Sequence, residues 1–215
     1  MRMRGVRLMR TVACGLLVLV PASAAPQRAT LHENMADATM MPEARFWSLV
    51  ESTRNTDPAA QIAALKAKLA ALTPEEIVGF ESCLDAQMRR SYRWDLWGAA
   101  YVAMGGASDD SFEYFRLWLI ARGQRDFEKV LADPDALADI APADSEQLEF
   151  EDLAHVPPDV WAAKTGKPWD DMPHLSAFFV PRGYGEPVGT KFSEDPAALA
   201  RQYPKLWRRF GGAAR

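Results

Sequence analysis

Repeated helix-start signatures constrain the fold of this chain more than any other feature of its sequence. In "DPAAQIAALKAKLAALT", we expect Asp57 to be the N-cap and Pro58 to occupy the first helical position. In "TPEEIVGF", Thr73 is the expected cap, Pro74 opens the helix, and Glu76 completes a capping box. Because apolar residues follow each start at the helical interval, without sustained β alternation, a mainly α fold is predicted.

The apolar spacing also predicts how far each helix extends. The stripe that follows Thr73 indicates one long helix, which continues to Met104 and ends at the Gly-Gly pair behind it. A further helix is expected to start at Asp110, which can cap with Glu113 three residues later. Pro134 separates two shorter helical pieces after it. The expected inner face of the helix from Asp110 consists of Phe112, Phe115 and Leu119.

The character of the chain changes after residue 140, where acids and then prolines become frequent. We expect a short helix in "VPPDVWAAKTG", an extended segment with turns in "LSAFFVPRGYGEPVG", and two final helical pieces separated at Pro204. The predicted organisation is a compact, bundle-like helical core domain over 42–140. An irregular, proline-rich extension over 141–215 ends in helical segments that pack on this core.

The N-terminus has the three-part pattern of a secretory signal peptide over residues 1–24. A basic run precedes a short apolar run, and small residues end at Ala24. This pattern predicts an exported protein, periplasmic or secreted, with a flexible linker over 25–41. The alternative is a cytoplasmic protein whose translation starts at Met40 or Met41, which would make residues 1–24 a mis-assigned leader.

Composition limits the classes of partner. Apolar residues make up 48% of the chain, which is enough to bury a sizeable core. The formal net charge is −4, and four of the arginines lie in the first 25 residues. Because the remaining chain is still more acidic and contains no basic run, we expect no nucleic-acid partner. No stretch after the leader is long and apolar enough to predict a membrane span, and a protein partner is compatible with this composition.

The stretch "SYRWDLWGAAY" at residues 91–101 could belong either to the hydrophobic core or to a functional site. Helical spacing places Asp95 on the inward face, among the aromatic residues Trp94, Trp97 and Tyr101. A buried carboxylate needs a cationic or hydrogen-bonding partner. We expect this partner to be Arg116 on the following helix, with Arg93 or backbone amides near Asp109 as alternatives.

The same residues allow a functional interpretation. Asp95, Asp109 and Asp110 would form an acidic or divalent-metal site if they converged at the helix junction, because carboxylates suit hard cations. Capping, however, accounts for Asp109 and Asp110. We therefore interpret the polar cluster of Arg93, Asp95, Asp109, Asp110 and Arg116 as structural, with the acid site as the alternative.

Other chemical motifs are weak. His32, His155 and His174 have no partner at metal-ligand spacing. Cys83 has no histidine nearby in sequence and is interpreted as a small buried hydrophobe. "RGYGEPVGTK" lacks the arrangement of a phosphate loop and is interpreted as an ordinary loop. We therefore assign no catalytic residue and no metal ligand, and we expect no cofactor.

Three segments resemble a bacterial family catalogued as domain of unknown function 4240: "RFWSLVE", "SYRWDLWGAAYVAMGGASDDSFEYFRLWLIARG" and "YPKLWRRFG". The resemblance covers about residues 43–210, and its middle block is the most specific. It implies no catalytic residues, because the family has no assigned activity. Its members usually begin close to the Phe-Trp pair without an export signal, so the leader of this chain departs from the family pattern.

These observations favour a non-catalytic binding or interaction module. The alternative is an enzyme that uses an acidic or divalent-metal site around Asp95, Asp109 and Asp110. Whether the protein is an enzyme, which partner it binds and what its oligomeric state is do not follow from the sequence.

Overall fold

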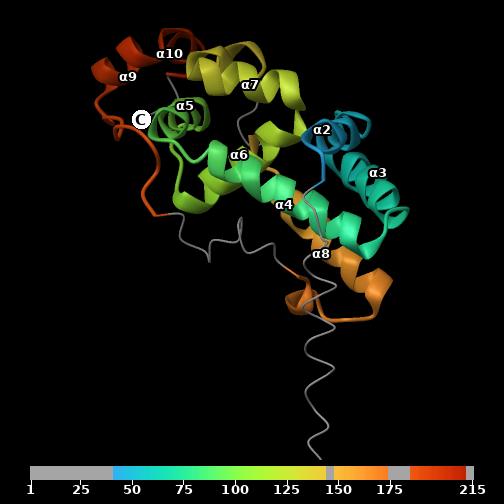
Figure 1. The fold of residues 1–215 in the computed structure, drawn as a ribbon. Helices are drawn as coiled ribbons and strands as arrows, with labels where there is room; N and C mark the ends of the chain where they lie inside the picture. Colours follow the sequence, from blue (N-terminus) through green and yellow to red (C-terminus); the bar gives the residue numbers. More distant parts are fainter. Residues whose placement is uncertain (1–40, 144–147, 174–184, 212–215) are drawn as a thin grey trace, which may run out of the picture. The chain divides into compact units, whose positions relative to one another are not determined.

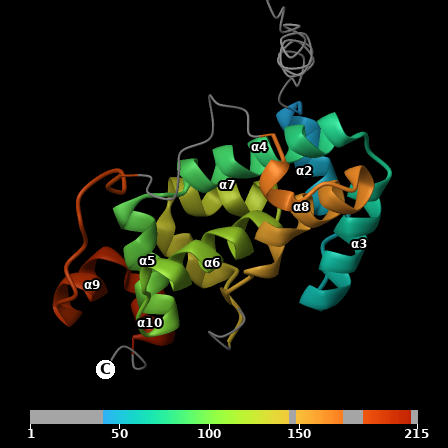
Figure 2. The same cartoon turned by 90° about the horizontal axis from the view of Figure 1, so that it is seen from below.

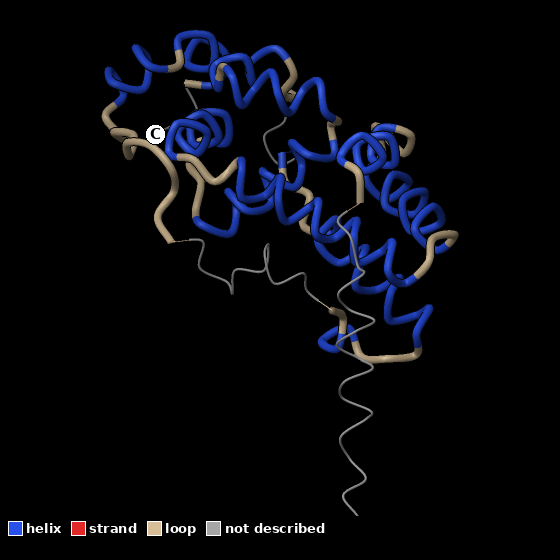
Figure 3. Tube along the Cα trace, in the orientation of Figure 1, coloured by secondary structure: helices blue, strands red, loops and turns tan. Residues whose placement is uncertain are grey.

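The computed structural model describes residues 41–143, 148–173 and 185–211. Within these ranges the regular structure is helical (Figures 1 and 3). The only β pairing among the described residues is an isolated bridge between Arg93 and Val188. Asp37–Arg215 form one compact unit. The predicted mainly α fold is therefore confirmed. The leader over 1–24 and the linker up to residue 40 lie outside the described residues.

The regular structure consists of α-helices and short 3₁₀ helices. In chain order they are α2 (Glu43–Glu51), α3 (Pro58–Ala70), α4 (Pro74–Arg90), α5 (Trp94–Met104), α6 (Asp109–Ala121), α7 (Gln124–Ala132), the 3₁₀ turn η1 (Pro134–Asp139), α8 (Asp152–Thr165), the 3₁₀ turn η3 (Trp169–Asp171), α9 (Pro196–Gln202) and α10 (Pro204–Phe210). Figure 2 shows α5 with α9 and α10 at one end, α3 with α8 at the other, and α6 between them.

The helix starts predicted at Asp57 and Thr73 are confirmed by their capping hydrogen bonds. The Asp57 carboxylate accepts a hydrogen bond from the Ala59 amide at 3.0 Å. Thr73 and Glu76 form the expected reciprocal capping box, with distances of 3.2 and 2.9 Å. These interactions involve residues at most three positions apart, so the sequence is sufficient to predict them.

The single long helix from Pro74 to Met104 is a prediction that the structure corrects. α4 ends at Arg90, and Arg93 has an extended backbone with φ −137° and ψ 141°. The Ser91 hydroxyl donates to the carbonyl oxygens of Gln87 and Met88 at 2.8 and 3.1 Å. The chain then pairs with Val188, as described below, so tertiary pairing overrides the helical pattern here.

Val188 forms two backbone hydrogen bonds across the break between α4 and α5. Its carbonyl oxygen accepts from the Trp94 amide and its own amide donates to the Tyr92 carbonyl, both at 3.0 Å. A segment almost a hundred positions away in the sequence thus satisfies backbone groups that a continuous helix would have paired internally.

The start of α6 is also corrected. Ser108, rather than Asp110, is the N-cap, and its hydroxyl accepts from the Ser111 amide at 3.2 Å. Asp109 and Asp110 lie in the first helical turn and are exposed. Carboxylates in this position interact favourably with the positive end of the helix dipole. The predicted inner face is confirmed, since Phe112, Phe115 and Leu119 are fully buried.

α8 is longer than the short helix expected from "VPPDVWAAKTG". It starts at Asp152 and contains Pro157 and Pro158 in its interior. An interior proline removes a backbone hydrogen bond and normally breaks a helix. The apolar face of α8 offsets this cost by packing on α3 and α4. The buried side chains of this face are Leu153, Val156, Val160 and Trp161.

The final helical segments belong to the same compact unit as the preceding helices. Tyr203, between α9 and α10, and Leu206 of α10 are buried, and α10 contacts α5, η1 and α9. The Asp135 carboxylate of η1 accepts hydrogen bonds from the Lys205 amide at 3.0 and 3.1 Å and from the Leu206 amide at 2.9 Å. It therefore satisfies backbone donors at the start of α10.

The packed unit also includes Met41, which the sequence analysis assigned to the linker. Its side chain is 4% exposed, and its carbonyl oxygen accepts from the Cys83 thiol at 2.9 Å. Met41 therefore belongs to the core, although the predicted linker included it.

Candidate functional site

The Asp95 carboxylate pairs with Arg93, and the expected pairing with Arg116 is wrong. Arg93 Nε donates to Asp95 Oδ1 at 3.0 Å, and Arg93 Nη2 donates to Asp95 Oδ2. Asp95 Oδ1 also accepts from the Leu96 amide at 2.8 Å. The break before α5 places both partners of this pair on the same turn. Their side chains are 34% and 35% exposed, so the pair lies at the edge of the core and not inside it.

Arg116 is buried in the core and binds backbone carbonyl groups. Its Nη1 atom donates to the Met88 carbonyl at 2.8 Å, near the C-terminus of α4. The guanidinium carbon lies 4.9 Å from the ring centroid of Tyr92 and 5.0 Å from that of Phe112. A cation suits the negative end of a helix and the faces of aromatic rings. Arg116 therefore holds α6 against α4.

The aromatic residues of the opening stretch form part of a stacked series. Trp94 stacks on Trp97 with a centroid distance of 5.1 Å, and Trp97 stacks on Phe112 at 4.8 Å. The Trp97 indole donates to the Ala107 carbonyl at 3.1 Å, which satisfies its polar atom. The series thus joins α5 to α6, and the structural interpretation of this stretch accounts for its contacts.

Tyr203 joins the same region to the C-terminal helices. Its hydroxyl donates to the Asp95 carbonyl at 2.8 Å, and burial raises its pKa well above the ordinary value. Gly98 lies against the Tyr203 ring and the Phe192 ring, where a Cβ atom would clash with both. The segments around Asp95 and Tyr203 therefore pack directly against each other.

The acid-site alternative gains no support from the described residues. Asp95 is engaged by Arg93, whereas Asp109 and Asp110 are exposed at the start of α6. In the described ranges, no group of three or more His, Cys, Asp or Glu side chains could hold a metal ion. The five residues that were predicted to form one polar cluster thus lie at three separate positions. These are the pair of Arg93 and Asp95, the start of α6 with Asp109 and Asp110, and the buried Arg116.

The remaining reactive residues are placed as follows. Cys83 is buried, as expected, and burial raises the pKa of its thiol to about 11, which disfavours the nucleophilic thiolate. His155 is exposed on α8. His32 and His174 lie outside the described residues.

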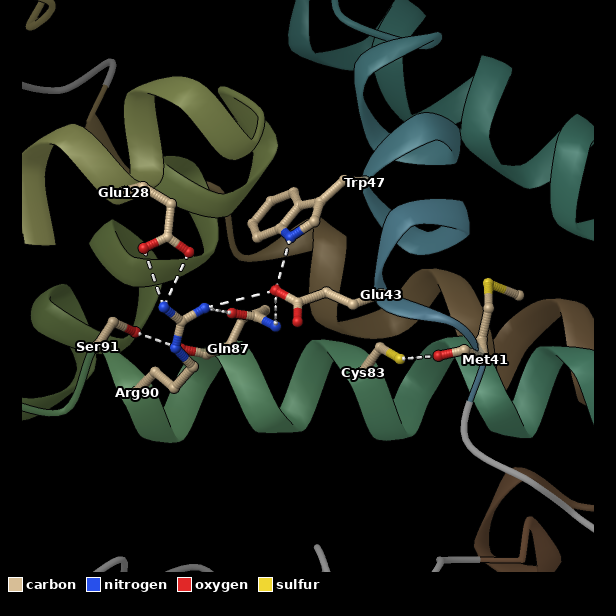
Figure 4. A network of polar contacts seen from close by, with 8 residues as sticks. All are labelled: Met41, Glu43, Trp47, Cys83, Gln87, Arg90, Ser91 and Glu128. Atoms are coloured by element: carbon tan, nitrogen blue, oxygen red, sulfur yellow. Dashed lines mark hydrogen bonds and ion pairs between the residues drawn. The ribbon is translucent and has the colours of Figure 1, made fainter.

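A polar network that the sequence analysis missed joins α2, α4 and α7 around Arg90 (Figure 4). Its guanidinium lies 3.6 Å from the Glu43 carboxylate and 2.8 Å from that of Glu128. It also donates to the Gln87 amide oxygen at 2.7 Å, and the Trp47 indole donates to Glu43 at 3.1 Å. Because each charge has a partner of opposite sign, we interpret this network as a clamp between helices.

A groove between α3 and α8 is a second feature that the sequence analysis missed. α3 and α8 pack directly against each other (Figure 2), and the groove has a volume of about 590 Å³. This volume is within the range of about 300–1,000 Å³ found for ligand pockets. Small and apolar side chains line it from both helices: Ala67, Ala70, Val160 and Ala163.

Charged side chains border this groove. Lys66 and Asp159 form an ion pair across it at 2.9 Å. Lys164 reaches from α8 to the Ala70 carbonyl at 3.1 Å. Both interactions are exposed, so they compete with water and contribute little to stability. The groove therefore has an apolar floor and lysine side chains that can rearrange toward a ligand.

None of the helices formed by residues 41–143, 148–173 and 185–211 is both long and apolar enough to cross a bilayer.

The interlocked aromatic, ion-pair and capping contacts define an all-helical domain held together from α2 to α10. The model of a family described as "Protein of unknown function (DUF4240)" matches residues 41–163. Because this match covers more than half of the chain, the protein belongs to this family, as the resemblance of its motifs indicated. The closing segment "YPKLWRRFG" lies beyond the match. No curated protein and no solved structure matches the chain significantly.

Proposed function

We propose that this protein is a non-catalytic interaction module that binds an acidic amphipathic helix of a protein partner. The observation that carries the proposal is the groove between α3 and α8, which combines an apolar floor with a border of two lysines, Lys66 and Lys164, and one aspartate, Asp159. Amphipathic helices commonly insert the apolar side chains of one face into such grooves.

The floor of the groove supports a helix as the occupant. Ala67 and Ala70 follow each other on α3 at helical spacing, and Ala163 faces them from α8. Short side chains at these positions leave room for larger apolar residues of a partner. Residues at i, i+3 and i+4 of a docked helix lie on one face and can enter the groove together.

The charges around the groove support an acidic occupant. Lys66 and Lys68 belong to α3, whose sequence from Pro58 to Ala70 contains no acid. Lys164 and Lys167 lie at and after the C-terminal end of α8. Of these lysines, Lys66 and Lys164 line the groove against one acid, Asp159, so the lining is net positive although the chain has a net charge of −4. Charge complementarity increases association rates and discriminates against unsuitable partners.

The same charges disfavour a second copy of this chain as the occupant. In a two-fold symmetric contact, the same surface faces itself. With two lysines against one aspartate, both copies would present a net positive lining to each other, and like charges oppose association.

A designed peptide tests the proposal. The probe is a helical peptide with leucine at i, i+3, i+4 and i+7 and glutamate on the flanking positions. A matched peptide carries lysine in place of each glutamate. We expect fluorescence anisotropy to show saturable binding of the glutamate peptide to the full chain, with at least tenfold weaker binding of the lysine peptide.

A variant of the groove provides the structural control. Ala67→Glu introduces bulk and a negative charge into the floor, at an exposed position, and we expect it to weaken binding at least tenfold. Ala59→Glu, on an exposed position in the first turn of the same helix but outside the groove, is expected to bind like the wild type. Equal affinity for both peptides, or equal affinity of both variants, would contradict the proposal.

A further inference from the structure

Three arginine side chains converge on one buried carboxylate where α6 meets α7. Asp126 lies in the first turn of α7, and its side chain is 3% exposed. The Arg125 guanidinium donates two hydrogen bonds to Asp126 Oδ1, at 3.0 and 3.1 Å. Arg122 Nε and Arg54 Nη2 lie 3.9 and 4.0 Å from Asp126 Oδ2. Because Arg54 is distant in sequence from the other two, this cluster escapes a search for basic runs.

Two of the three guanidinium groups retain donor capacity. A separation of 3.9 or 4.0 Å allows attraction between charges but is too long for a hydrogen bond. The Nε atom of Arg122 is buried and has no hydrogen-bond partner. The Trp118 ring supports this guanidinium with a centroid distance of 5.9 Å. Since each guanidinium carries five N–H donors in a planar fork, Arg54 and Arg122 can bind a further acceptor.

The cluster also has a surplus of positive charge. Three guanidinium groups face the Asp126 carboxylate, and the nearby Glu51 carboxylate accepts a hydrogen bond from the Gln124 amide at 3.1 Å. Burial, followed by repulsion from Arg54, lowers the pKa of the Arg122 guanidinium, although Asp126 partly opposes this effect. Three cations thus share two carboxylates at the corner of α6 and α7.

We propose that Arg54, Arg122 and Arg125 form a binding site for a phosphate group. A phosphate supplies acceptor oxygens to the unused donors of Arg54 and Arg122 and compensates the surplus charge. Planar guanidinium groups match the geometry of phosphate oxygens. The side chain of Arg125 is 83% exposed, so it can turn from Asp126 toward a ligand that approaches from solvent. The site is independent of the groove between α3 and α8.

Titration with inorganic phosphate tests this site. Isothermal titration calorimetry of the full chain is carried out at constant ionic strength, with chloride replacing phosphate in the reference. We expect saturable binding of one phosphate per chain. Arg54→Gln is expected to weaken this binding about tenfold, the loss that corresponds to one hydrogen bond between charged groups. Glycerol phosphate, tested in parallel, distinguishes free phosphate from a phosphate monoester, which would bind more tightly if the site holds part of a larger ligand.

Arg45→Gln is the matched control. Arg45 is an exposed arginine of α2 that lies outside the cluster and pairs with one carboxylate, Glu76, at 2.7 Å. We expect it to bind phosphate like the wild type. Arg122→Gln, checked for folding by circular dichroism, is expected to lose affinity like Arg54→Gln. The absence of saturation beyond the chloride reference would overturn the proposal. Equal phosphate affinity of Arg54→Gln and Arg45→Gln would also overturn it.

Discussion

Asp95 shows how a carboxylate among aromatic side chains can be structural without being fully buried. Its bidentate pair with Arg93 and its hydrogen bond to the Leu96 amide fix the first turn of α5. Both side chains of the pair are about one-third exposed, so water compensates part of any loss. Removal of one partner of the pair therefore does not leave a fully buried, unpaired charge, and it costs less than breaking a buried ion pair.

We expect Asp95→Ala to lower the free energy of unfolding by about 1–2 kcal/mol, since one partly exposed ion pair and one backbone hydrogen bond are lost. Chemical denaturation measures this change. The double variant Arg93→Ala with Asp95→Ala should lose less than the sum of the two single variants, because either change already breaks the pair. A loss above about 3 kcal/mol would indicate a fully buried pair and contradict the described geometry.

Folding strongly changes the protonation of the Glu81 carboxyl group on α4. Its Oε2 atom is buried without a hydrogen-bond partner. Burial, with a further contribution from the Asp85 carboxylate, raises its pKa from 4.5 to about 8. The folded protein therefore holds a proton on Glu81 at pH values at which the unfolded chain has released it.

This difference makes stability depend on pH. Between pH 4.5 and about 8, the folded state binds up to one proton more than the unfolded state, so stability falls as the pH rises. The slope contributed by Glu81 is at most about 1.4 kcal/mol per pH unit. We expect Glu81→Gln to flatten this part of the curve of unfolding free energy against pH. Glu75→Gln, at an exposed position of α4, should leave it unchanged, and identical slopes in both variants would contradict the assignment.

At the scale of elements, close packing between α5 and the C-terminal helices depends on Gly98. A Cβ atom at this position would lie 2.9 Å from the Phe192 ring and 2.9 Å from Tyr203 Cζ, and still closer to the Tyr203 hydroxyl. Contacts this short force neighbouring groups to move. The helix interior therefore contains a glycine in spite of its low helix propensity.

We expect Gly98→Ala to destabilise the fold by about 1–3 kcal/mol through this overlap. Tyr203→Phe, which removes the hydroxyl oxygen, should cost about 1 kcal/mol alone because the hydrogen bond to Asp95 is lost. In the double variant, loss of the Tyr203 hydroxyl removes part of the overlap with the added Cβ atom at position 98. Thermal unfolding of the four proteins should therefore show less than additive effects, and strict additivity would be evidence against a direct contact.

The elements also show what sequence can predict and where it fails. The start of α4 is predictable because Thr73 and Glu76 interact within one turn. The break before α5 was missed because it depends on Val188, far along the chain. The length of α8 was missed because tertiary burial offsets its two prolines. The choice of Arg93 rather than Arg116 for Asp95 follows from that same break.

In the molecule as a whole, helices from distant parts of the sequence build both the groove and the arginine cluster. The groove combines residues 66–70 of α3 with residues 159–164 of α8, and the arginine cluster combines Arg54 with Arg122 and Arg125. No local pattern marks either feature, so neither can be predicted from the sequence. α9 and α10, beyond the family match, pack on the same unit.

We interpret the aromatic stretch at residues 91–101 as structural, and we propose the groove between α3 and α8 as the surface that binds a partner. Amide chemical-shift mapping of the isotope-labelled chain, titrated with the glutamate peptide, tests this account most directly. We expect the amide signals of Ala67, Ala70 and Ala163 to shift with peptide concentration, while those of Trp94 and Trp97 stay in place. Shifts centred on Trp94 and Trp97, with the groove signals unchanged, would contradict the account.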